Sequence, residues 1–482
     1  MGVLTQYEPK DVFCYFETIC SIPHGSGKTD RIVAYLKQFA ADRGLACECD
    51  KANNVIIRKA ASLGYEKADV LILQGHHDMV CEKGEGVAFD FVHQPIVPVV
   101  DGDWIRAAGT TLGGDNGIGV AMILAILDND ALPHPPLEVL ITADEEIGML
   151  GAFALDCSHL VGHKLINLDS EYEGVLMCSC AGGVNVRSTI PVSRETVTGQ
   201  IVELSIKGLT SGHSGVEIDK GRANANVLMA RLLHELAASC SYRIVTLEGG
   251  SRETAIAAAV EATLLVDATQ TKALCALVEK LGTEFQKEYV ASEPHMEIRA
   301  TEGEVDTVSA VTKTDTALLH TVLVAIPDGV QVMSLEMPGL VQTSTNFGTL
   351  KLTKEALTFS NTIRSSVTPQ KEWITERIAS IVKLGGGTVK TDGNYPGWAY
   401  NPNSVIKDTI LAAYKKLFGK EASVEAVHAG IECGLFADSI SGLDCVSIGP
   451  DMADVHTPRE HLSISSTART YKLLKKVLAL SK

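Results

Sequence analysis

The sequence lacks any apolar run that approaches the roughly 18 residues of a membrane-spanning helix. Its first residues, MGVLTQYEPKDVFCYF, contain no basic segment followed by an apolar one, which is the pattern of a secretory signal. We therefore expect neither membrane spanning nor secretion, and we predict a cytoplasmic protein.

Basic side chains are scarce, because 42 Lys and Arg residues stand against 59 Asp and Glu residues and the net charge is −17. Nucleic acids and anionic membranes are bound by basic faces that neutralise phosphate groups. The charge therefore argues against nucleic acid or a membrane as a partner.

The 12 cysteines include no C-x-x-C pair, which would have indicated a redox or metal motif. They are scattered along the chain, and no secretory signal accompanies them. We interpret them as reduced thiols, most of them in the core.

What is present is a globular composition, with 45% hydrophobic and 21% charged residues. A chain of 482 residues exceeds what one core usually supports, so we expect two or three domains. In the first third, runs of Val, Ile and Leu alternate with helical stretches, notably a helix at 117–129. Such runs are typical of strands in a parallel or mixed sheet covered on both faces, which indicates an α/β fold.

A second pattern begins near Ala181, where strands of alternating polarity are separated by single amphipathic helices. This pattern is typical of an α+β layer built from split β-α-β units. After Gly387 the α/β pattern returns. We therefore predict a discontinuous α/β domain of residues 1–185 and 391–482, interrupted by an inserted α+β domain of residues 186–390.

Polar side chains follow several of the apolar runs. LILQGHHDMV places His76 and Asp78 two apart, so both leave the same face of an extended strand, and the carboxylate can orient the imidazole as a metal ligand. In ITADEEIG, adjacent side chains point in different directions, so of Glu145 and Glu146 one can bind metal while the other faces substrate water. Asp169 ends another apolar run, INLDSE.

Two further candidates lie in loops. TLGGDNGIG places Asp115 in a glycine-flanked turn before a helix, where a carboxylate can bridge two cations or cap the helix. His456 lies in the Pro-containing loop DMADVHTPREHL. Taken singly, each candidate has an ordinary alternative as a strand-end polar residue, an acidic turn, a helix cap or an exposed histidine.

Taken together, these groups converge on the carboxyl edge of a sheet, where open α/β folds build their sites. Mixed His and carboxylate ligands suit zinc, with cobalt or manganese as substitutes, better than calcium or iron–sulfur chemistry. The residues therefore predict a metal centre at this edge.

Five motifs occur in a fixed order: LQGHHDMV, GGDNG, DEE, LDSE and HTPRE, with SGHSG, STNFG and HAGIECG between them. In this order they resemble the M20 metallopeptidase family, and their spacing is closest to the branch that cleaves aminoacyl-histidine dipeptides such as carnosine. The resemblance implies a zinc-peptidase catalytic domain with a mixed sheet, an inserted lid or dimerisation domain of ferredoxin-like β-α-β units, and hydrolysis of small dipeptides.

The same resemblance implies two divalent ions. The implied ligands are His76, Asp115 and Asp169 for one ion, and Asp115, Glu146 and His456 for the other. Glu145 would be the general base that takes a proton from a water held between the ions and returns it to the leaving amine, and Asp78 would assist the catalytic site beside His76.

In the inserted domain, His213 of GLTSGHSG matches the family's lid histidine, which implies stabilisation of the oxyanion. Asn346 and Arg364 match the substrate-positioning pair, and an arginine suits a free C-terminal carboxylate. Gly430 would leave a backbone group open to substrate, and His428 beside it is a weaker candidate.

Other functions stay open at this point. An aminoacylase-like amidohydrolase or a tripeptide aminopeptidase would use the same metals, and differ in its substrate anchors. A non-catalytic binding protein would be expected to lack the base or a ligand, and none is missing. We expect a homodimer, in which His213 would act within its own chain or across the dimer.

Overall fold

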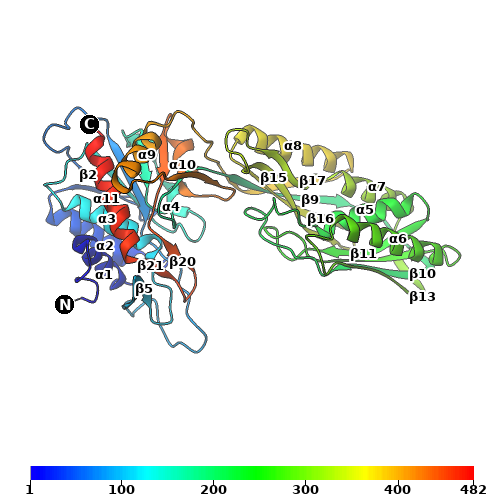
Figure 1. The fold of residues 1–482 in the computed structure, drawn as a ribbon. Helices are drawn as coiled ribbons and strands as arrows, with labels where there is room; N and C mark the ends of the chain where they lie inside the picture. The colour runs from blue at the N-terminus through cyan, green and yellow to red at the C-terminus, as the bar shows by residue number, and fades with distance from the viewer. Residues whose placement is uncertain (1) are drawn as a thin grey trace. The chain divides into compact units, whose positions relative to one another are not determined.

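The computed structural model describes residues 2–482, which form two compact units (Figure 1). The first unit comprises the chain up to Cys180 together with Trp398–Ala426 and Ile431–Lys482, and the second comprises Ala181–Gly397 and Val427–Gly430. The predicted insertion, 186–390, is shorter than the second unit because the first and last strands of that unit extend beyond both predicted boundaries.

The first unit is built on an eight-stranded mixed sheet with the order β1-β2-β6-β3-β7-β19-β8-β18. The central strands β6, β3, β7 and β19 are parallel, and β1, β2 and β8 are antiparallel to their neighbours. The strands are β1 (Ala46–Cys49), β2 (Val55–Lys59), β3 (Leu71–His76), β6 (Leu137–Thr142), β7 (Lys164–Asn167), β8 (Val175–Cys180), β18 (Ser423–Val427) and β19 (Asp444–Ser447).

Every residue of β3 and β6 is buried, which explains their nearly continuous apolar sequences. Helix α3 packs on β3 and is buried throughout Ile118–Leu127, so it is apolar on all sides rather than amphipathic. The helices of this unit are α1 (Lys10–Cys20), α2 (Asp30–Asp42), α3 (Gly114–Leu127), α4 (Leu150–Ala154), the short 3₁₀ helix η1 (Cys157–His159), α9 (Val405–Phe418), α10 (Glu432–Ser439) and α11 (Ile464–Leu480). A second sheet, in the order β20-β21-β5-β4, contains β4 (Pro98–Asp101), β5 (Trp104–Ala107), β20 (Met452–Ala453) and β21 (His461–Ser463).

The second unit has one nine-stranded antiparallel sheet in the order β13-β10-β12-β11-β15-β16-β9-β17, with β14 paired to β15. Its own apolar core lies between this sheet and four helices. The strands are β9 (Gly182–Pro191), β10 (Arg194–Lys207), β11 (Tyr242–Gly249), β12 (Val260–Val266), β13 (Glu297–Val311), β14 (Gly329–Met333), β15 (Val341–Leu352), β16 (Ala356–Ser365) and β17 (Thr388–Tyr395). The helices are α5 (Ala225–Ala237), α6 (Thr271–Glu288), α7 (Lys313–Ala325) and α8 (Thr368–Leu384).

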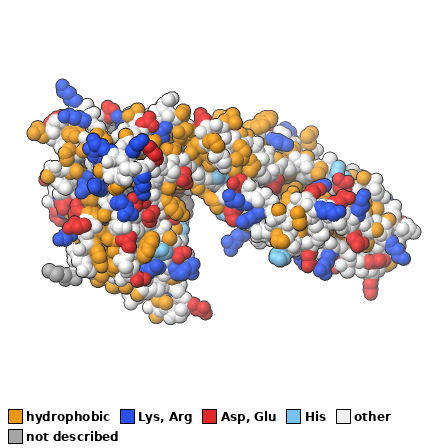
Figure 2. Space-filling model, viewed as in Figure 1, with side chains coloured by type: hydrophobic (Ala, Val, Ile, Leu, Met, Phe, Trp, Pro, Cys, Tyr) orange, Lys and Arg blue, Asp and Glu red, His pale blue; other side chains and the backbone are white. Residues whose placement is uncertain are grey.

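The fold agrees with the predicted mixed α/β class. None of the helices within residues 2–482 has the length and apolar content needed to cross a membrane. Acidic and basic side chains are interspersed on the face shown in Figure 2.

Candidate metal centre and substrate-binding groups

Three neighbouring strands of the first unit end beside the candidate metal ligands. His76 is the last residue of β3, Glu145 and Glu146 follow β6, and Asp169 follows β7. Because β6, β3 and β7 are adjacent and parallel, their carboxyl ends lie at one edge of the sheet. The Nε2 atom of His76 lies 3.3 Å from Oδ1 of Asp169.

Asp115 lies between two histidines. Its Oδ1 is 3.1 Å from Nε2 of His76, and its Oδ2 is 3.0 Å from Nε2 of His456. The same nitrogen of His456 lies 2.9 Å from Oε1 of Glu146. Asp115 thus joins two groups of ligands, one containing His76 and Asp169 and the other containing Glu146 and His456.

The backbone of His456 has a φ of 62°, in the left-handed region that costs a non-glycine residue about 1–3 kcal/mol. This conformation brings the imidazole to Asp115 and Glu146 from a loop rather than from a strand end.

Asp78 is buried and faces Nδ1 of His76, whereas Nε2 of the same ring faces Asp115. Its Oδ1 is 3.4 Å from Nδ1 of His76 and accepts a 3.0 Å hydrogen bond from the backbone N–H of Glu145. Its Oδ2 accepts hydrogen bonds from the Ser26 hydroxyl at 2.7 Å and from the Glu146 N–H at 3.3 Å. Asp78 therefore orients a candidate metal ligand and the loop that carries both glutamates.

In the second unit, Arg364 is buried, with only 7% of its surface exposed. Its Nη1 donates a 3.0 Å hydrogen bond to the hydroxyl of Tyr395, while its Nε is buried without a hydrogen-bond partner. Within residues 2–482, no carboxylate forms an ion pair with this guanidinium. A buried arginine without an acidic partner is favourably placed to receive an anionic ligand.

Strand pairing explains how Tyr395 reaches Arg364. Tyr395 of β17 pairs with Gly183 of β9, and Gly183 pairs with Arg364 of β16. A Cβ atom on Gly183 would lie 2.6 Å from the Tyr395 ring, so the glycine leaves the space that the ring occupies. A Cβ atom on Gly430 would also lie 2.6 Å from this ring, so this glycine leaves space for the ring as well.

His213 and His428 are electrostatic neighbours of Arg364. Burial, followed by the charge of Arg364, lowers the pKa of His213, and the same two causes lower the pKa of His428 to about 4. Nδ1 of His213 accepts hydrogen bonds from the N–H groups of Gly215 at 3.1 Å and Val216 at 3.3 Å. This assignment leaves Nε2 as the nitrogen that carries the proton in a neutral imidazole.

Asn346 is buried on β15 and supports the segment next to His213. Its Nδ2 donates 2.9 Å hydrogen bonds to the carbonyls of Glu253 and Ala255, and Ala255 forms a β-bridge with His213. The Oδ1 atom of Asn346 is buried and has no hydrogen-bond partner. Asn346 can therefore offer a ligand an acceptor, while its donors are engaged by the backbone.

The comparison with family models gives a match to the peptidase family M20/M25/M40 over residues 72–480, which contains both ligand groups around Asp115. This chain belongs to that family. It is a metal-dependent hydrolase that acts on peptide bonds.

Two relatives cover nearly the whole of this M20 peptidase. It is 36% identical over 480 residues to the cytosol non-specific dipeptidase of Escherichia coli K12, covering 99% of each chain. It is 34% identical to the crystal structure of aminoacylhistidine dipeptidase from Vibrio alginolyticus, with a TM-score of 0.95 over 99% of this chain and 98% of that one. An aminopeptidase from Bacillus cereus, at 16% identity and a TM-score of 0.57, shares the fold.

The charges at the centre of this M20 peptidase fit a site for cations. Burial raises the pKa of Glu145 to about 8, and burial together with Asp115 raises the pKa of Asp169 well above its usual range. Burial also favours the neutral form of Asp115, but hydrogen bonds from His456 and His76 outweigh it and hold the Asp115 pKa well below the ordinary value. Hydrogen bonds to Asp115 and Glu146 raise the pKa of His456 to about 11. Protonated histidines here balance the negative charge of the carboxylates, and bound cations would balance the same charge.

The donor atoms also have suitable spacing. Ligand atoms of His76, Asp115 and Glu146 all lie within 4.8 Å of one another, and Oδ1 of Asp169 is buried with Nε2 of His76 at 3.3 Å but without a hydrogen bond. A buried carboxylate oxygen that lacks a hydrogen bond is costly unless a cation or another donor reaches it. These residues therefore fit divalent ions.

Some residues near the predicted sites were not identified from the sequence. Tyr395 contacts Arg364, but only the pairing of distant strands reveals this. Glu171 is a further carboxylate near Asp115, with its pKa raised to about 7 by burial and then by the charge of Asp115. Glu460 belongs to the HTPRE motif, yet its contacts with the Asp115 turn have no local sequence signal.

Proposed function

We propose that this M20 peptidase is a two-metal dipeptidase that hydrolyses dipeptides ending in histidine, including β-alanyl-histidine. The observation that carries the proposal is the position of Asp115, whose two oxygens each face a different histidine, at 3.1 Å from His76 and 3.0 Å from His456. The names of the Escherichia coli and Vibrio alginolyticus relatives support a dipeptide substrate, and the second supports histidine at its C-terminus.

Each ion would have three ligands from this chain, with Asp115 common to both. The proposed sets are His76, Asp115 and Asp169 for one ion, and Asp115, Glu146 and His456 for the other. Zinc is the proposed native metal, with cobalt or manganese as functional substitutes, because the donors are imidazoles and carboxylates. When bound, the two ions supply polarisation of the scissile carbonyl and a lowered pKa for water.

Glu145 is the proposed general base. It is not needed in either ligand set, and burial already favours its proton-bearing form, with a pKa raised to about 8. Its backbone N–H is held by Asp78, so the orientation of the base is coupled to the residue that orients His76. Glu145 would take a proton from the attacking water and return it to the leaving amine.

His213 is the proposed donor to the oxyanion of the tetrahedral intermediate. The two N–H groups that donate to its Nδ1 favour the tautomer with a proton on Nε2. The lowered pKa of His213 keeps this imidazole neutral near pH 7, so the group donates a hydrogen bond rather than a full charge. Loss of one such donor typically costs about 10²–10³-fold in kcat.

Arg364 is the proposed anchor for the free C-terminal carboxylate of the substrate. The guanidinium is buried, forms no ion pair in the described part of the chain, and keeps an unpartnered Nε. An anchor for the C-terminal carboxylate would favour short peptides, whose C-terminus lies close to the hydrolysed bond. Asn346 would contribute a hydrogen-bond acceptor through its Oδ1 atom. Gly430, which has no side chain, would leave a backbone group open to the substrate.

The substrate class is tested with zinc- and cobalt-reconstituted enzyme on four sets of compounds: Xaa-His dipeptides including carnosine, other dipeptides, tripeptides and N-acetyl amino acids. We expect the highest kcat/KM on the Xaa-His set. Fastest turnover of N-acetyl amino acids would favour the amidohydrolase alternative, and fastest turnover of tripeptides would favour the aminopeptidase alternative. Either result would contradict the proposed substrate.

The Arg364 anchor predicts a specific change in selectivity. Arg364→Met should lower kcat/KM for a dipeptide with a free carboxylate by about 30-fold or more, since loss of a buried charged contact costs about 2–5 kcal/mol. The C-terminal amide of the same dipeptide lacks the carboxylate, so its kcat/KM should change much less. The control is Arg377 on α8, which lies outside this cluster, and Arg377→Met should leave both values unchanged.

The assembly and the location of the protein are also part of the proposal. A homodimer and a cytoplasmic location are proposed, the second supported by the name of the Escherichia coli relative. Because His213 and Arg364 belong to one unit and influence each other electrostatically, we propose that they act on the same substrate molecule.

Coexpression of two impaired variants tests this pairing. Chains carrying His213→Ala and chains carrying Arg364→Met should be no more active when they assemble together than when expressed separately, because no unit then contains both groups. Coexpression of each variant with wild-type chains is the matched control for assembly. Recovery of activity in the mixed variants would contradict joint action within one chain.

A further inference from the structure

Glu460 is a buried carboxylate that binds the backbone of the turn carrying Asp115. Its Oε2 accepts hydrogen bonds from the N–H groups of Leu112 at 2.7 Å and Gly113 at 3.2 Å. Its Oε1 accepts from Gly114 at 2.7 Å and from Asp115 at 3.4 Å. Four consecutive N–H groups thus surround one side chain that is only 3% exposed.

The two glycines of the turn are explained by this arrangement. Gly113 has a φ of +72°, which turns successive N–H groups toward one point, and such a concave set of N–H groups favours an anion. A Cβ atom on Gly114 would lie 3.2 Å from Oε1 of Glu460, so a side chain there would crowd the carboxylate. The turn is therefore shaped around Glu460 as well as around Asp115.

Glu460 also connects two distant parts of the chain. It follows His456 by four residues, in the loop that brings this histidine to Asp115 and Glu146. Its hydrogen bonds therefore hold the Asp115 turn against the His456 loop. Each oxygen accepts from two N–H groups, and such charge-assisted bonds are about twice as strong as neutral ones.

From these contacts we infer that Glu460 is a positioning residue for the metal centre, which sets the separation of Asp115 and His456 before any cation binds. The inference rests on the proposed assignment of these two residues as metal ligands. Loss of such an outer contact typically weakens metal binding about 10–100-fold. Glutamine is the decisive replacement, because its NH₂ group would face two N–H donors where a carboxylate oxygen now accepts.

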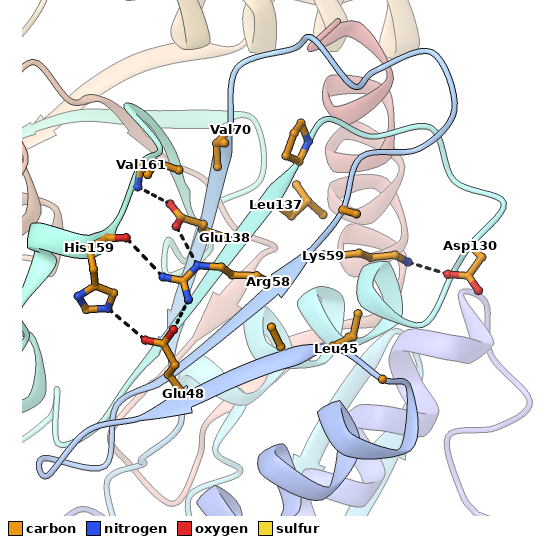
Figure 3. A pocket seen from close by; sticks show the side chains of 14 residues that line it. Leu45, Glu48, Arg58, Lys59, Val70, Asp130, Leu137, Glu138, His159 and Val161 are labelled. Carbon is orange, nitrogen blue, oxygen red and sulfur yellow. Dashed lines mark hydrogen bonds and ion pairs between the residues drawn. The ribbon is translucent and has the colours of Figure 1, made fainter.

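Glu138 offers a matched control in the same unit (Figure 3). It is also a buried carboxylate, and its Oε2 accepts 3.0 Å hydrogen bonds from the N–H groups of Val161 and Gly162. It lies at the amino end of β6, beside Arg58 in a cavity of about 920 Å³, whereas Glu145 and Glu146 follow the carboxyl end of that strand. Glu138→Gln therefore removes a similar structural contact away from the metal ligands.

The experiment measures Zn²⁺ affinity of metal-free protein by competition with a chromophoric chelator, alongside thermal unfolding without metal. Both Glu→Gln variants should unfold at lower temperature than wild type, but only Glu460→Gln should bind Zn²⁺ about 10–100-fold more weakly. Equal weakening in both variants, or wild-type affinity in Glu460→Gln, would overturn the inference. If Glu460→Gln does not fold, Glu460→Asp is measured in its place, and wild-type affinity in that variant would likewise overturn it.

The same titration separates this inference from the proposed function. Absence of tight Zn²⁺ binding by the wild-type protein would overturn the proposed metal centre and the role of Glu460 with it. Tight binding by wild type together with unchanged binding by Glu460→Gln would overturn only the role of Glu460.

Discussion

Glu145→Gln is expected to lower kcat for an Xaa-His dipeptide by about 10²–10⁴-fold while both metal ions stay bound. The substitution keeps the size of the side chain and the backbone N–H that donates to Asp78 at 3.0 Å. It removes only the ability to take a proton from water and return it to the leaving amine. The measurement is steady-state kinetics at equal metal content, determined by elemental analysis of the same samples.

Glu146→Gln is the matched control for this result, because Glu146 is the adjacent residue and its Oε1 lies 2.9 Å from His456. This variant should lose metal as well as activity, so excess Zn²⁺ should partly restore its turnover. Glu145→Gln should not respond to added Zn²⁺. A kcat close to wild type would refute Glu145 as the base, and loss of metal from Glu145→Gln would indicate that this residue is a ligand.

Asp115→Asn is expected to have the largest effect on metal content. Asp115 is the one residue common to both proposed ligand sets, with an oxygen facing each histidine. Replacing the carboxylate with an amide removes a negative charge from both ion sites, so we expect nearly complete loss of bound metal and activity near background. Metal content is measured by elemental analysis after gel filtration, and affinity by calorimetry.

Asp169→Asn provides the comparison, since Asp169 belongs to only one proposed ligand set and contacts His76 but not His456. This variant should keep the ion held by Asp115, Glu146 and His456 and lose the other. A wild-type metal content in Asp115→Asn would refute the bridging role. An equal loss of both ions from Asp169→Asn would indicate that the two ions bind as a unit rather than separately.

The sequence identified the candidates at strand ends because burial leaves a strong local signal. The apolar runs of β3 and β6 are buried on both faces, and parallel neighbours must end at the same sheet edge. This reasoning brought His76, the two glutamates and Asp169 together. In the structure His76 contacts Asp169 and Asp115, Glu146 contacts His456, and Glu145 is an electrostatic neighbour of His76 and Asp115. Their roles as ligands and base stay predictions until the variants are measured.

Asp115 and His456 were candidates only as loop residues, without the signal of a buried strand end. One lies in a turn before α3 and the other in a loop with a left-handed backbone, so neither has a burial pattern that predicts its position. Their assignment as metal ligands came from the resemblance to the M20 family. The match of the family model confirms that the chain belongs to this family. The predicted domain boundaries differ from the compact units by a few residues, although the change of pattern near Ala181 coincides with the start of the second unit.

The sequence by itself determined the α/β class, the family and the candidate ligands, because these depend on local hydrophobic patterns and on short motifs in a fixed order. Only the tertiary structure revealed that Tyr395 contacts Arg364 across Gly183, and that Glu460 binds four N–H groups of the Asp115 turn. Both contacts join segments that are far apart in the chain. Which distant segments meet is decided by strand pairing and by packing of the whole chain, and no single segment carries that information.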